Sequence, residues 1–309
     1  MISILLIKQI AQLFLMILMG YILVKTDILK SKDSKTISVI VLYLVMPCVI
    51  INSFQVDYTV EKRNGLILSV VVALLIHIIF LIVDIIFKKM FKLDVIERAS
   101  NMYSNAGNLI IPIVAAILGD EWVLYSCGFM SVQLVFLWTH CKMLISQEKQ
   151  IDIKKILTNI NLICVIIGII LFISGIRLPE VINGTISSVA KLVAPLSMIV
   201  SGMLMADIEL KSLFVNKRIY LVVFMRMVVY PVLVLVFLKL SNVQSFVENG
   251  YTILLITFLA TMTPSASTVT QMAQVYDNNS DYANRINILT VLVCIVTMPI
   301  MIMFYEMIM

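Results

Sequence analysis

Residues 99–119 read ASNMYSNAGNLIIPIVAAILG. The stretch has no charged residue and, as a helix, is long enough to cross a hydrocarbon core of ~30 Å. Near its middle, however, Asn105, Gly107, Asn108 and Pro112 stand where an uninterrupted membrane helix favours aliphatic residues. Proline removes a backbone hydrogen bond and collides with the preceding turn, and glycine loosens the backbone further. The sequence therefore predicts a helix that is broken inside the membrane.

The rest of the chain has the composition of a membrane protein. Of its 309 residues, 61% are hydrophobic and 13% are charged, whereas soluble domains have about 45–50% apolar and about 25% charged residues. The apolar residues fall in ten blocks, and without alternating strand patterns each block must satisfy its backbone as a helix. We expect an all-α membrane protein with ten transmembrane helices, at residues 1–24, 36–56, 64–87, 99–119, 122–141, 156–176, 181–206, 219–238, 250–276 and 286–305.

The distribution of positive charge predicts the orientation. Most of the 23 lysines and arginines lie in the loops that follow the odd-numbered spans, including the loops 25–35 and 88–98. Because positively charged loops stay in the cytoplasm, both termini are predicted to lie outside the cell membrane.

The chain also resembles itself at an offset of about half its length. Residues 37–57 and 186–207 align Pro47 with Pro195, and the two stretches end in Asp57 and Asp207. Because each half contains an odd number of spans, the second half enters the membrane upside down, as in many secondary transporters. We expect a first five-helix repeat at 1–145, a short cytoplasmic linker at 146–155 and a second, inverted repeat at 156–309.

A second interrupted span supports this division. Residues 260–273 read ATMTPSASTVTQMA, so Thr263, Pro264 and Ser265 bring hydroxyls and a proline to the middle of the ninth span. Paired breaks in the two halves indicate a central site, where half-helix N-termini offer free N–H groups and a positive dipole end to an anion. The alternative is a pair of structural kinks with polar contacts between helices.

Five ionisable residues inside spans are further candidates, because each needs a partner or a water-filled cavity; they are His77, Asp84, His140, Lys191 and Arg226. Lys191 lies one turn before Pro195, and the alternative is that its side chain extends to the membrane interface. Arg226 stays protonated and can bind a substrate carboxylate, although pairing with an acid such as Asp84 or a structural role are alternatives. His77 and Asp84 are seven residues apart on one helical face, and His77, Asp84 or His140 can carry coupling protons.

Several other functions lack sequence support. The positive residues lie in short loops, which argues against a nucleic-acid partner, and the five cysteines lie in apolar blocks without metal-type spacing. No phosphate-binding loop or hydrolase motif occurs. We therefore expect no metal site, no cofactor and no enzymatic activity.

Four motifs together resemble the auxin efflux carrier family, and the resemblance covers essentially the whole chain. They are NAGNLIIP at 105–112, APLSMIVSGMLMA at 194–206, RMVVYP at 226–231, and ATMTPSAST at 260–268 with Tyr276 and Asp277 following. The family includes bacterial permeases for malate and malonate and the plant PIN-FORMED auxin carriers.

The resemblance implies two inverted five-helix repeats whose helices 4 and 9 are broken and cross at Pro112 and Pro264. It also implies a scaffold domain that often mediates formation of a homodimer. An asparagine before the helix-4 break, Asn105 or Asn108, is expected to hold the substrate carboxylate. The ninth span has no asparagine before Pro264, so the hydroxyl of Thr263 is expected to substitute. The long cytoplasmic loop of many plant members is absent, which favours a compact microbial-type carrier.

Together these observations predict a secondary transporter that moves a small organic anion, a mono- or dicarboxylate such as malate or malonate, by alternating access. The coupling ion, H⁺ or Na⁺, the direction of transport and the particular carboxylate stay open. One rival is a membrane receptor or sensor that binds a carboxylate metabolite in the same cavity, against which the short cytoplasmic loops argue. Another is an intramembrane enzyme, for which only His77, Asp84 and His140 offer catalytic groups.

Overall fold

A computed structural model describes residues 2–147, 154, 158–206 and 217–309, without the side chains of residues 2–7, 9, 10 and 108. The described chain is all-helical, as expected, and contains six helical stretches long and apolar enough to cross a membrane. Three shorter apolar helices accompany them. Most of the predicted linker 146–155 lies outside the described residues.

Most predicted spans are helical over most of their described residues, and some change helix type on the way. They are α1 (Ile2–Lys25); η1 (Ser31–Asp33) with α2 (Ser34–Ile40), η2 (Val41–Val45) and α3 (Met46–Ser53); α4 (Val60–Phe91); η3 (Asp120–Trp122) with α7 (Val123–Phe136), η4 (Leu137–Cys141) and α8 (Lys142–Ser146); α10 (Ile160–Ser174); α14 (Lys217–Phe224) with η5 (Met225–Val229) and α15 (Tyr230–Ser241); and α18 (Ser280–Ile308). A short turn, η6 (Val243–Phe246), precedes α16.

The remaining spans are interrupted. The two expected breaks separate α5 (Val95–Met102) from α6 (Ala106–Ile117) and α16 (Gly250–Met262) from α17 (Ser267–Val275). A kink that the sequence analysis did not predict separates α11 (Glu180–Ala190) from α12 (Val193–Ala206). Pro195 is the third residue of α12 and has no N–H to donate to the preceding turn.

Several helices extend beyond their predicted spans because charged residues occupy their end turns. The helix predicted at 64–87 runs as α4 from Val60 to Phe91 and includes Glu61 and Lys88. Its first turn is capped by Thr59, whose hydroxyl accepts the Lys62 N–H at 3.1 Å. Such end residues reach water from within a helix, so hydropathy alone predicts helices that are too short at both ends.

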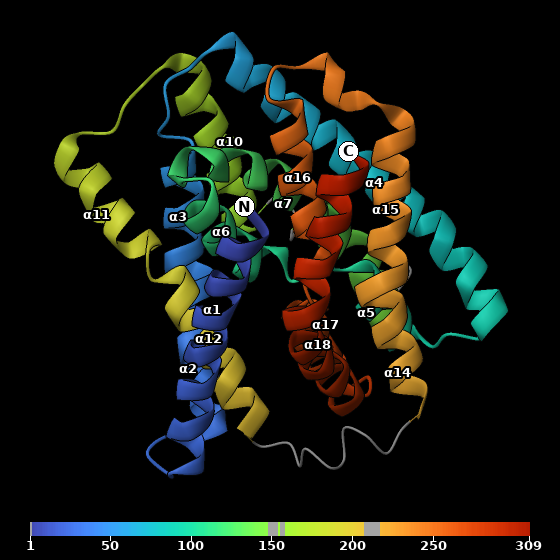
Figure 1. Ribbon diagram of the computed structural model, residues 1–309. Helices are drawn as coiled ribbons and strands as arrows, with labels where there is room; N and C mark the ends of the chain where they lie inside the picture. The colour runs from blue at the N-terminus through green and yellow to red at the C-terminus, as the bar shows by residue number, and fades with distance from the viewer. Residues whose placement is uncertain (1, 148–153, 155–157, 207–216) are drawn as a thin grey trace.

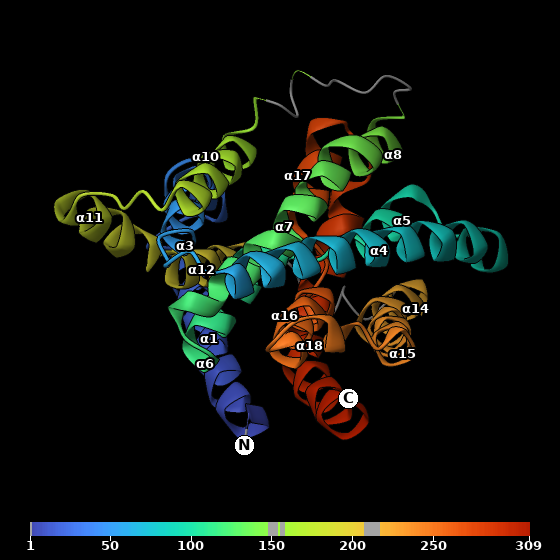
Figure 2. The same ribbon diagram turned by 90° about the horizontal axis from the view of Figure 1, so that it is seen from above.

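The helices form two groups that mix both halves of the sequence (Figure 1, Figure 2). The first helix group contains α1, α2, α3, α10, α11 and α12, and the second contains α4 to α8 and α14 to α18. Within the first group, α1 packs along α12 so closely that a Cβ on Gly20 or Gly202 would overlap main-chain atoms of the facing helix. Small residues permit this backbone-to-backbone approach in membranes. α6 also packs against α1 and α12 and so contacts the first group.

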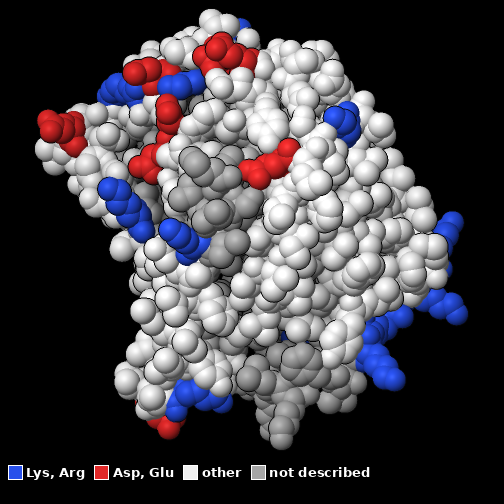
Figure 3. All heavy atoms as spheres, in the orientation of Figure 1, with Lys and Arg blue, Asp and Glu red and all other residues white. Residues whose placement is uncertain are grey.

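The surface matches a bilayer environment. Most of the face drawn in Figure 3 is uncharged, and the charged side chains gather toward its ends and edges. Large apolar side chains such as Val181, Leu240 and Ile170 are exposed on the helices. Water would oppose such exposure, whereas lipid does not.

Candidate ligand-binding site at the crossing of two broken helices

The two interruptions lie against each other. Residues 103–105 separate α5 from α6, and residues 263–266 separate α16 from α17. At their centres Ser104 and Ser265 pair as an isolated antiparallel bridge. The chain therefore crosses itself here in two short extended segments.

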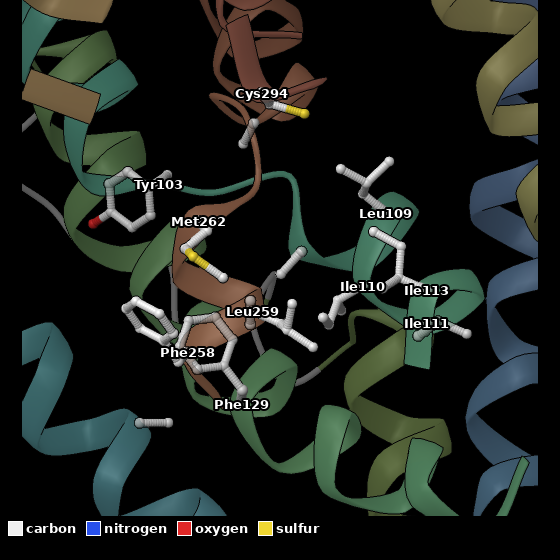
Figure 4. Close-up of a cluster of buried hydrophobic side chains, with 14 of the residues drawn as sticks. Tyr103, Leu109, Ile110, Ile111, Ile113, Phe129, Phe258, Leu259, Met262 and Cys294 are labelled. Carbon is white, nitrogen blue, oxygen red and sulfur yellow. The ribbon is translucent and has the colours of Figure 1, made fainter. Parts of the chain in front are cut away.

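Backbone hydrogen bonds join the two segments. The Asn105 N–H donates to the Pro264 carbonyl at 2.8 Å, and the Ala266 N–H donates to the Tyr103 carbonyl at 2.9 Å. Figure 4 shows the segments crossing near Tyr103 and Met262. Backbone N–H and C=O groups freed by one break thus bond to those freed by the other, as an apolar environment requires. The N–H groups of Asn105 and Ala266 are therefore not free for a ligand.

The crossing lies about two turns before Pro112, which corrects the expectation that the helices cross at Pro112 and Pro264. Pro112 lies inside α6. A proline removes one hydrogen bond to the preceding turn, and a helix can continue through it with a kink. In the other span, Pro264 does lie in the crossing segment.

Each crossing serine is held by the long helix of the next span, Ser104 by α7 and Ser265 by α18. The Ser104 hydroxyl donates to Gln133 Oε1 at 2.5 Å, and Gln133 Nε2 donates to the Ser104 carbonyl at 2.8 Å. In the second half, Asn287 Nδ2 donates to the Ser265 carbonyl at 2.5 Å, and the Ser265 N–H donates to the Thr290 hydroxyl at 3.1 Å. These contacts hold the crossing from both sides.

Gln133, Asn287 and Thr290 were not among the predicted site residues. The residues predicted outside the two breaks were ionisable, whereas these three are uncharged polar residues inside apolar blocks. The signal that could have found them is an amide or hydroxyl at a position where a membrane helix favours an aliphatic residue.

Replacing Gln133 with leucine is expected to lower the free energy of unfolding by about 1–3 kcal/mol, because it leaves both polar groups of Ser104 without this partner. Thermal melting in detergent measures the effect. Gln271→Leu, on α17, is the matched control and is expected to melt near the unmodified protein. Equal melting of the Gln133 variant and the unmodified protein would show that the contact does not hold the crossing.

Arg226 lies at the ends of the other two half-helices. It is fully buried; Nη1 donates to the Asn101 carbonyl at 3.0 Å, and Nη2 donates to the carbonyls of Thr261 at 2.9 Å and Thr263 at 2.7 Å. These carbonyls lie at the C-terminal ends of α5 and α16, where helix dipoles concentrate negative charge. One guanidinium thus stabilises both ends.

A local change of helix type accompanies this arginine. Arg226 belongs to the π-helical turn Met225–Val229, directly before Pro231 at the start of α15. The same order occurs at Val41–Val45 before Pro47. Proline provides no N–H to the carbonyl of the preceding turn, and the wider π turn is a frequent feature of functional segments.

A pocket lies on the other side of the crossing, between the two helix groups. Its empty space, including the mouth, is about 1050 Å³. We call it the central pocket; its polar lining residues are Ser38, Ser104, Asn105, Ser131, Gln133, Asn161, Ser197, Ser201, Ser267, Thr268 and Gln271, and Gly107 lines it through its backbone.

The central pocket is electrostatically suited to an anion although no Lys, Arg, His, Asp or Glu stands among the described residues that line it. The N-terminal residues of both α6 and α17 are in its wall, including Gly107 and Ser267. A helix N-terminus carries about half a positive charge and unpaired N–H groups. The crossing therefore directs two positive helix ends to the pocket and two negative ends to Arg226.

The sequence pattern of one protein family, described as membrane transport protein, matches residues 5–302. The chain belongs to the auxin efflux carrier family. Membership makes it a multi-pass membrane transporter, from a family of transporters and not of enzymes. No curated protein matches the chain.

In this transporter, Asn105 and Gly107 are the predicted site residues that line the central pocket. Asn105 also lies beside a smaller apolar cavity of about 450 Å³ between α1, α6 and α18, which Pro264 lines as well. Asn105 is therefore placed where two cavities meet. The side chain of Asn108 lies outside the described part of the structure.

The other predicted binding residues have different positions. The Thr263 hydroxyl donates to the Ala260 carbonyl at 3.0 Å, and the buried Ser265 belongs to the crossing. Pro112 lines a third cavity, farther along α6 than the central pocket. None of these three lines the central pocket.

The predicted coupling residues do not form one site. His77 is buried, with Nδ1 2.7 Å from the Ala73 carbonyl and its ring stacked on Phe136 at 5.0 Å between centroids. His140 Nδ1 lies 2.8 Å from the hydroxyl of Tyr103 and so contacts a residue of the crossing.

Asp84 pairs with an arginine that the sequence analysis had assigned to a loop. Arg98 Nε and Nη2 donate to its carboxylate at 2.6–3.1 Å, and the two side chains are 1% and 12% exposed. The neighbouring Glu97 is fully buried and accepts hydrogen bonds from Arg218 and from the Tyr282 hydroxyl. These ion pairs join α4, α5, α14 and α18 of the second helix group.

Proposed function

We propose that the chain is a secondary transporter that carries a small carboxylate anion, such as malate or malonate, across the cell membrane by alternating access. The observation that supports this most directly is the central pocket, which lies between the two helix groups and receives the N-termini of α6 and α17. An anion there is held by fixed dipoles and neutral donors, and it can leave when the groups move.

Asn105 is the side chain proposed to contact the carboxylate. It lies at the start of α6, lines the central pocket and makes no side-chain capping bond to its own helix. Its amide can therefore donate to a ligand oxygen. Hydroxyls of Ser267 and Thr268 at the start of α17 are proposed to complete the donor set.

The topology that we propose has ten spans in two inverted five-helix repeats with both termini outside. The paired breaks and the alternating positive loops support it. In this orientation the central pocket faces the cytoplasm, because Ser38 lines it close to the positively charged loop 25–35.

Uptake of radiolabelled mono- and dicarboxylates into proteoliposomes tests the proposal. We expect saturable uptake of at least one acid, and Asn105→Ala should raise its KM by about 10- to 100-fold, since a hydrogen bond to a charged group is worth about 1.5–3 kcal/mol. Imposing proton and sodium gradients separately identifies the coupling ion.

Asn183→Ala is the matched control, because Asn183 lies on α11 outside the three cavities described. It should leave KM unchanged. A folded protein that binds a carboxylate and moves none would contradict the carrier and favour the receptor alternative.

A further inference from the structure

A third cavity lies farther along α6 from the crossing than the central pocket does. Its empty space, including its opening to solvent, is about 860 Å³, and we call it the far cavity. One wall comes from α3, α11 and α12 of the first helix group, with Asn52 and Lys191, and the other comes from α6, η3 and α7 of the second, with Pro112 and Asp120. It therefore lies at the same boundary between groups as the central pocket.

The far cavity differs from the central pocket in charge. Among the described residues that line the three cavities, Lys191 is the one with a positive charge, and it lies at the kink between α11 and α12. Asp120 lines the opposite wall, and these two described residues form no ion pair with each other. Lys191 and Asp120 are both exposed, so the far cavity is open to the surface at these two side chains. A lysine inside an apolar span needs water or an anion, and the far cavity can hold either.

A single layer of side chains separates the two cavities. Ser53 lines the far cavity and Cys127 lines the central pocket, and Ser53 Oγ lies 3.0 Å from Cys127 Sγ. Both are nearly fully buried. Ser53 also donates to the carbonyl of Ile50, which lines the central pocket. We call the Ser53–Cys127 contact the partition.

The partition joins the two helix groups, because Ser53 ends α3 and Cys127 lies in α7. The same division recurs on α6, where Gly107 lines the central pocket and Ile111, one turn later, lines the far cavity. Any movement that separates α3 from α7 would connect the cavities.

We propose that the far cavity is a second binding site for the transported carboxylate, held there by Lys191, and that the anion passes between the cavities only when the partition opens. This inference rests on the proposed function, since it concerns the path of the same substrate. It assigns Lys191 a role in binding and Ser53 and Cys127 a role in closure.

Ser53→Cys tests the partition. Two cysteines at these positions are close enough to form a disulfide with Cys127 under mild oxidation, which would fix α3 to α7. We expect carboxylate uptake to fall at least tenfold on oxidation and to return with a reductant, while binding to the central pocket, measured by isothermal titration with the same acid, is retained.

Ser53→Cys combined with Cys127→Ala is the matched control, and its uptake should not respond to oxidation. If the disulfide forms and uptake continues, or if no disulfide forms, the partition is contradicted. A reduced protein that moves no carboxylate contradicts the proposed function instead.

The role of Lys191 in binding an anion can be tested without a transport measurement. In Ser187→Cys, which places a thiol in the far cavity, labelling rates of negatively and positively charged methanethiosulfonate reagents are compared by mass spectrometry. Lys191→Gln is expected to lower the ratio of anionic to cationic labelling about 3- to 10-fold, and Asp120→Asn is expected to raise it.

Lys62→Gln serves as the control, because Lys62 lies near Glu121 and does not line the far cavity. It should leave the ratio unchanged. A transported acid should also slow the labelling of residue 187 when Lys191 is present. The second binding site is contradicted if Lys191→Gln leaves the labelling ratio unchanged. It is also contradicted if the transported acid does not slow the labelling of residue 187.

Discussion

Arg226→Met is expected to lower the free energy of unfolding by about 2–4 kcal/mol and to abolish transport. Methionine has similar length but no donor, so the carbonyls of Asn101, Thr261 and Thr263 lose their shared partner in a buried environment. Melting of the purified protein measures the loss, and a decrease of about 5–10 °C corresponds to it.

Arg226→Lys should restore only part of this stability, because an ammonium group keeps the charge but not the planar fork that reaches three carbonyls. Arg177→Met, at an exposed loop position, is the control and should melt normally. If Arg226→Met melts normally and only raises KM, the guanidinium contacts the substrate and not the helix ends.

Asp84→Asn is expected to cost about 3–5 kcal/mol, because it leaves Arg98 without its counter-charge in a nearly buried site. The double variant Asp84→Leu with Arg98→Leu should recover much of the loss, since two apolar residues leave no unpaired charge. Thermal melting of the three variants measures both effects.

The exposed pair of Asp57 and Arg177 provides the contrast. The hydrogen bond from Arg177 lowers the pKa of the Asp57 carboxyl, but both side chains are largely exposed. Solvent screens such pairs, so Asp57→Asn should leave the melting temperature nearly unchanged. A variant at Asp84 that melts normally but no longer responds to a proton gradient would favour the coupling role over the structural one.

The two breaks could be predicted because their cause is local. Pro264 and the polar residues around Asn105 conflict with an apolar helix within a few positions, and this conflict is visible without knowledge of the fold. The exact crossing point was not predicted from Pro112, because a helix continues through a proline when the missing bond is the only conflict.

The partners of Arg226 and Asp84 could not be found in the same way. Arg226 binds carbonyls more than thirty residues away in sequence, and its position in a π turn alters the face on which a regular helix would place it. Arg98 was counted with a charged loop, although it lies in α5 and reaches back to Asp84 on α4. Which side chains pair across helices depends on how the helices pack, and the hydrophobic periodicity of the sequence does not show this packing.

The uncharged wall of the central pocket has a consequence for how the protein responds to acidity. Peptide dipoles and amides have no protonation state in the physiological range, whereas simple carboxylic acids ionise with a pKa of about 4. The second carboxyl of a short dicarboxylate has a higher pKa because of the first negative charge, so neither the ligand nor the wall titrates between roughly pH 7 and pH 9. A change of pH in this range would then leave binding of the anion to the central pocket unchanged and alter only the rate at which the protein changes conformation. Recognition of the anion would thus be independent of the ion gradient that drives transport.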